Sequence, residues 1–104
     1  MLDFSGKDEK SKEICLHYAK QFKNADLIPI LECSKPVSTE AQAKSLSEFF
    51  WKMLEASADD RDNGIGVLGE TDTQYWMERS MNIISGYLYT IGFEDVWEKI
   101  SNDA

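Results

Sequence analysis

The chain is poor in cysteine, proline and histidine, with two Cys, two Pro and one His in 104 residues. Two cysteines, Cys15 and Cys33, are too few for the disulfide framework of a small secreted domain, although a single bridge between them stays open. With His17 as the only histidine, the sequence offers neither zinc-ligand spacing nor a Ser–His–Asp arrangement. We therefore expect no metal centre, no cofactor and no enzymatic activity.

Long hydrophobic runs and an excess of basic residues are also missing. No apolar stretch approaches the ~20 residues that span a bilayer, and no segment has the pattern of a signal peptide. The 19 acids outnumber the 11 bases, which gives a net charge of −8. This balance disfavours direct nucleic-acid binding and docking on anionic lipid, since both depend on basic side chains. It favours a basic protein partner. The missing signal peptide and the missing bilayer-spanning run make a cytoplasmic location the expected one.

The residues that are present predict a helical domain. Apolar residues make up 42% of the chain, which is enough for one domain over residues 1–104. They recur at helical spacing, and no segment alternates with the period of two that a strand requires. We predict an all-α bundle of three main helices, at about 8–23, 39–57 and 73–91, with short helices near 27–33 and 93–101. Whether this domain is an excised part of a larger protein stays open.

Capping patterns support the starts of two of these helices. Thr39 and Gln42 have the spacing of a capping box, in which each side chain binds the backbone N–H of the other residue. Thr71 and Gln74 repeat this spacing before the third main helix. We expect both pairs to cap their helices.

Glycine and proline mark three further positions. Gly92 predicts a C-terminal cap. Gly86 lies inside the third main helix, where it costs ~1 kcal/mol against Ala, and therefore predicts a close contact with another helix. The apolar segment Leu27–Leu31 contains Pro29, so it is either a short helix with proline in its first turn or a buried extended piece.

The linker after the second main helix carries the most distinctive pattern, a G-x-G-x-x-G motif at residues 64–69 set among acids. A dinucleotide fingerprint needs a preceding strand and room for an anionic pyrophosphate, and this linker follows a helix. As a calcium loop, the spacing places Asp59, Asn63 and Glu70 at ligand positions, but Arg61 occupies the third position. We therefore expect a solvated linker that joins two helices.

A further motif comes after this linker. Trp76, with Arg79 three residues later and a small residue after it, begins a helix rich in Ile, Leu and Tyr. Together with the amphipathic helix from Ser38 to Leu54 and the acidic glycine linker, it resembles the all-alpha domain of type IV secretion coupling ATPases. Those proteins feed DNA or effectors into conjugation machinery. The resemblance covers roughly half of the chain and implies a role in substrate recognition, without the Walker motifs or the membrane anchor of the motor.

We predict a non-enzymatic recognition module that binds a basic protein partner, such as a relaxase or a relaxosome accessory protein. Acids would steer the partner, and aromatic and Arg side chains would anchor it. The predicted partner-binding residues are Trp51, Asp59, Asp60, Asp62, Glu70, Asp72, Tyr75 and Arg79. The alternative is a stand-alone acidic inhibitor or immunity protein that binds a basic nucleic-acid enzyme. Either protein could be an oligomer.

Overall fold

The computed structural model describes residues 1–64 and 66–104, and over these residues the chain is helical without any strand. The predicted all-α fold is confirmed. The α-helices are α1 (Glu9–Gln21), α2 (Ile28–Leu31), α3 (Glu40–Asp62), α4 (Thr73–Thr90) and α5 (Glu94–Asp103). Short 3-10 turns are η1 (Gly6–Asp8), η2 (Ala25–Leu27) and η3 (Val67–Gly69).

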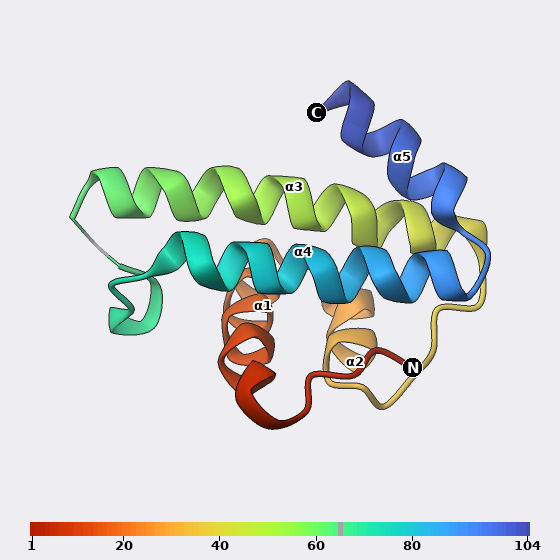
Figure 1. Cartoon of the computed structure of the whole chain (residues 1–104), viewed down its shortest axis with the longest axis horizontal. Helices are drawn as coiled ribbons and strands as arrows, with labels where there is room; N and C mark the ends of the chain where they lie inside the picture. Colours follow the sequence, from red (N-terminus) through yellow and green to blue (C-terminus); the bar gives the residue numbers. More distant parts are fainter. Residues whose placement is uncertain (65) are drawn as a thin grey trace.

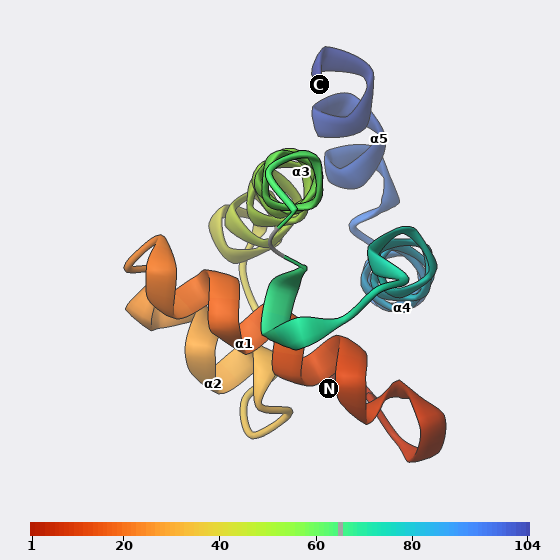
Figure 2. The same ribbon diagram turned by 90° about the vertical axis from the view of Figure 1, so that its left-hand side faces the viewer.

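The two long helices α3 and α4 lie side by side and antiparallel, and the other helices pack on them (Figure 1). Viewed along the pair, α1 and α2 lie on one side of it, and α5 lies on the other side (Figure 2). Helix α5 contacts both members of the pair. None of the helices in the described part of the chain is long and apolar enough to cross a bilayer.

The core lies where apolar stripes at helical spacing face each other across these helices. Burying one large aliphatic or aromatic side chain contributes roughly 1.5–3 kcal/mol to stability, so the fully buried members dominate the fold. The largest of them are Tyr18, Phe49, Phe50, Ile14, Ile30, Leu31, Leu46, Met53, Ile84 and Leu88.

Both cysteines are free thiols, so the possible bridge is not formed. Cys15 is fully buried, and its Sγ lies 3.8 Å from the Ser80 hydroxyl, which connects α1 to α4. Burial raises the pKa of Cys15 to about 12, and the hydrogen bond to Ser80 acts weakly in the opposite direction. Because the thiolate is the reactive form, this cysteine is an inert part of the core at neutral pH.

Helix α3 continues past its predicted end at residue 57 and reaches Asp62. Three of the acids assigned to the linker, Asp59, Asp60 and Asp62, therefore lie on the last turns of α3. Aspartate only weakly disfavours a helix interior, so these residues do not end it. Gly64 ends it, with a φ of +76° and an N–H that donates to the Arg61 carbonyl.

The first predicted capping box is confirmed and the second is wrong. The Thr39 hydroxyl accepts from the Gln42 N–H at 3.1 Å, and the Gln42 side-chain oxygen accepts from the Thr39 N–H at 3.2 Å. At α4 the cap is Asp72, whose carboxylate accepts from the Tyr75 N–H at 3.2 Å. Aspartate is a stronger N-cap than threonine, so the helix starts one residue later than the Thr71 pattern implies.

The structure also tests the predictions that were made for Pro29, Gly92 and Gly86. In segment 27–31, Leu27 is the last residue of η2 and Ile28–Leu31 form α2, with Pro29 in the first turn, so the helical alternative holds. Gly92 has a φ of +89° and ends α4 as predicted. The close contact predicted for Gly86 is wrong, because a methyl group there would meet no described atom of another helix within 4 Å. The close approach is at Gly66, where a methyl group would overlap the backbone carbonyl of Glu70.

These two glycines give a matched test of the fold. We expect Gly66→Ala to lower the free energy of unfolding by about 1–3 kcal/mol, because the linker backbone must move away from Glu70. Gly86→Ala should raise it by up to ~1 kcal/mol, because alanine favours the helix and meets open space. Urea unfolding of both variants measures the difference, and effects of the same sign and size would contradict the linker geometry.

Candidate docking site on the α3–α4 pair

Four of the eight predicted partner-binding residues lie exposed at one end of the α3–α4 pair. Asp59 and Asp62 are on the last turns of α3, and Asp72 and Tyr75 are at the start of α4. Tyr75 is 41% exposed, and its ring meets the Trp76 ring edge-on with centroids 4.9 Å apart. This end of the pair therefore presents carboxylates and one accessible aromatic ring.

Two other predicted acids are bound by side chains of α1. Asp60 accepts a hydrogen bond of 2.7 Å from the Tyr18 hydroxyl, whose ring is fully buried. Burial, together with this hydrogen bond, raises the pKa of Tyr18. Glu70 lies 3.2 Å from the Lys10 ammonium and accepts from the indole N–H of Trp76 at 3.1 Å. These two acids fix the end of α3 and the linker against the rest of the fold.

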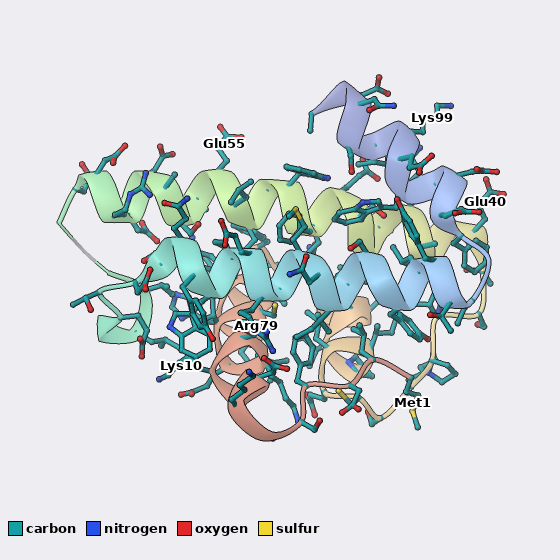
Figure 3. All side chains as sticks on the ribbon, in the orientation of Figure 1. Met1, Lys10, Glu40, Glu55, Arg79 and Lys99 are labelled. Atoms are coloured by element: carbon teal, nitrogen blue, oxygen red, sulfur yellow. The ribbon has the colours of Figure 1, made fainter. Side chains whose placement is uncertain are left out.

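Arg79 is held within the molecule as well. Its guanidinium donates through Nε to Asp8 Oδ1 at 2.9 Å and forms an ion pair with the same carboxylate. The hydrogen bond to Asp8 raises the pKa of Arg79. Figure 3 shows Arg79 extending from α4 toward α1, on the side of the pair where Lys10 also lies. The pair joins residues 71 positions apart, a separation for which the sequence gives no signal.

Trp51 lies on α3 at a distance from the other predicted residues and packs against α5. Its indole N–H donates to the Ser101 hydroxyl at 3.0 Å, and its ring centroid is 5.9 Å from that of Trp97. Trp51, which was predicted to bind a partner, therefore packs within the fold between α3 and α5.

The sequence did not point to an apolar cleft that opens between α3 and α4 beyond the end of α5. We call it the open cleft; its volume is about 200 Å³. Its apolar lining comes from both helices: Phe50, Leu54, Ala58, Met77 and Met81. Polar and charged groups complete the lining: Ser57, Arg61, Thr73, Gln74 and Glu78. Helical spacing predicted an apolar stripe here but not that part of it stays uncovered.

A second cleft adjoins the open cleft. We call it the α5 cleft; it has a volume of about 620 Å³, and Leu54 lines both. Its other lining residues are Glu48, Trp51, Lys52, Glu55, Ile100, Asp103 and Ala104. Glu55 projects from the edge of α3 that faces away from α4 (Figure 3). The two clefts form one surface on the α5 side of the pair, with apolar residues bordered mainly by acids.

The acids at the end of α3 lie in an electrostatically unfavourable position. A helix carries a partial negative charge at its C-terminus, so carboxylates there are destabilising and cations are stabilising. Asp59 and Asp62 are exposed at this end, and Arg61 is the one base of the last turn, 3.6 Å from Asp62. The end of α3 is therefore a surface that favours a cation.

The structure gives the G-x-G-x-x-G motif a local role in the linker. Gly64 and Gly69 have positive φ values of +76° and +77°, and Gly66 permits the close approach to Glu70. Because Asp59 is helical and Asn63 is the C-cap of α3, the predicted calcium spacing is not a loop. Among the residues that the structure describes, no group of three or more His, Cys, Asp or Glu side chains could hold a metal ion.

Comparisons with protein-family models, with curated proteins and with solved structures find no match to this chain. The likeness to the coupling ATPases therefore stays a prediction based on the Trp76 motif, the helix before it and the glycine linker. The open cleft, the α5 cleft and the acidic end of α3 are the surface features on which a functional proposal can rest.

The internal role of Arg79 can be tested by a double-mutant cycle. We expect Arg79→Gln and Asp8→Asn each to lower the thermal unfolding midpoint, because each leaves the other group without its partner. The double variant should lose less than the sum, since both changes remove the same interaction. Lys35→Gln, at an exposed base, is the control. Additive losses, or an unchanged midpoint for Arg79→Gln, would contradict this role.

Proposed function

We propose that this chain is a non-enzymatic recognition module that binds a basic protein through the α5 side of the α3–α4 pair. The observation that carries the proposal is the open cleft, whose partly exposed apolar residues are Leu54, Ala58 and Met81 and which lies next to exposed carboxylates such as Glu78. Accessible apolar side chains inside a polar border are typical of protein-binding sites. The net charge of −8 favours a basic partner, because complementary charge accelerates encounter and excludes acidic partners.

The charges at the end of α3 support the same proposal. Asp59 and Asp62 oppose the helix dipole, and among the described residues the one ion pair they make is the exposed contact of Asp62 with Arg61, which adds little stability. Residues that reduce stability without a contact that fully compensates are expected at functional sites. A cation from a partner would relieve the unfavourable potential, so binding would supply the stabilisation that the isolated chain lacks.

The resemblance suggests which basic protein to test first. Coupling ATPases use their all-alpha domain in substrate recognition, so the proposed partner is a relaxase or a relaxosome accessory protein. If binding also blocked the catalytic activity of a basic nucleic-acid enzyme, the chain would instead be assigned as an inhibitor.

The decisive variant is Asp59→Asn combined with Asp62→Asn. We expect it to weaken binding to a purified basic relaxosome protein by about fivefold to tenfold, and to raise the thermal unfolding midpoint of the chain alone. Calorimetric titration measures the first effect and thermal unfolding the second.

The matched control is Asp26→Asn combined with Glu32→Gln, which changes net charge equally at exposed positions near α2. It should weaken binding clearly less than the α3 variant. Equal losses in the two double variants would show that only net charge matters, and the proposed surface would then be wrong.

A further inference from the structure

We propose that the open cleft binds an amphipathic helix of the partner protein, and that this helix carries basic residues along its edges. This inference rests on the proposed function and specifies the class of partner. It is supported by the way α5 already packs on the same face, by the spacing of the lining residues and by the charges at the border.

Helix α5 shows that this face of the pair accepts an amphipathic helix. Its buried anchor, Trp97, is 6% exposed and has its ring centroid 5.6 Å from that of Phe50. Phe50 also lines the open cleft, so the surface on which α5 packs and the open cleft share this side chain. Beyond α5 the surface continues as the open cleft, where Leu54, Ala58 and Met81 stay partly exposed.

The lining residues repeat at the interval that a docked helix requires. Thr73, Met77 and Met81 recur every four residues on α4, which spans ~12 Å, or about two helical turns. Leu54 and Ala58 have the same interval on α3. A groove between two helices with this period accommodates a third helix that inserts apolar side chains at i, i+3 or i+4, and i+7.

Methionine suits such a surface, because its unbranched thioether adapts to partners of different shape. The charges at the border favour a basic partner. Glu78 and Arg61 line the open cleft, and the α5 cleft adds Glu48, Glu55 and Asp103 against one base, Lys52, so acids outnumber bases over the two clefts together. A second copy of this chain would meet like charge, since its net charge is −8. A basic helix instead places cations beside these carboxylates and near the end of α3.

Methionine methyl groups provide a direct readout, because the four methionines divide into two pairs. Met77 and Met81 line the open cleft, Met77 at its floor with 3% exposure and Met81 half-buried, whereas Met53 is fully buried without lining the cleft and Met1 is exposed at the N-terminus. The probe is a short helical peptide of Leu and Lys with an apolar face, added to the protein labelled at its methionine methyls. We expect the NMR signals of Met77 and Met81 to shift, and those of Met53 and Met1 to stay in place.

Two matched variants test whether the peptide occupies the open cleft. Ala58→Tyr fills the cleft from α3 and should reduce peptide affinity at least about tenfold. Ala41→Tyr makes the same change at an exposed position near the start of α3 and should leave affinity unchanged. Equal losses in the two variants, or shifts of all four methionines alike, would overturn the inference.

Two further measurements identify the occupant. A helical peptide of Leu and Glu should produce no shift of Met77 or Met81, and equal binding would overturn the requirement for basic residues. Shifts that track protein concentration without any peptide would show that a second copy occupies the cleft, which also overturns it. A basic relaxosome protein could bind with the predicted loss of affinity in the Asp59 and Asp62 variant while the NMR signals of Met77 and Met81 do not shift. In that case the proposed function would stand, and only the proposal of a helix in the open cleft would fail.

Discussion

The packing of Trp97 against Phe50 and Trp51 determines which part of the α3–α4 pair is covered. All residues of α5 are described, and Trp97 is the buried one among them, so this ring is the main anchor of the helix. The hydrogen bond from Trp51 to Ser101 adds a polar contact farther along α5. Because α5 is held over Phe50 and Trp51, it leaves the part of the same face around Leu54, Ala58 and Met81 only partly covered.

The opposite side of the pair is closed by interactions of a different kind. Tyr18 binds Asp60, and Arg79 binds Asp8, so α1 and the turn before it are joined to both long helices. Such partly buried charged hydrogen bonds fix geometry more than they add stability. As a result, α1, α2, α3 and α4 pack into one connected group of helices, and α5 lies on the other side of the α3–α4 pair from α1 and α2. Recognition by a preformed surface of this kind loses little conformational entropy.

The sequence predicted the helices well because their evidence is local. Periodic apolar residues, the Thr39 capping box and Gly92 each act within a few residues of chain. The errors arose where distant groups decide the outcome. Nothing near Arg79 reveals that Asp8 binds it, and an apolar stripe containing Met77 does not show whether another helix covers it. The acids before Gly64 were predicted to be linker because aspartate is common in turns, yet the helix continues through them.

The central claim is that a basic partner lies on the α5 side of the pair, in the open cleft. It is tested most directly by photo-cross-linking from Gln74, an exposed residue that lines this cleft. Gln21, exposed at the end of α1, is the matched position on the other side of the pair. With a purified basic relaxosome protein, we predict cross-linking from Gln74 and little from Gln21. Equal capture from both positions, or capture from Gln21 alone, would contradict the claim.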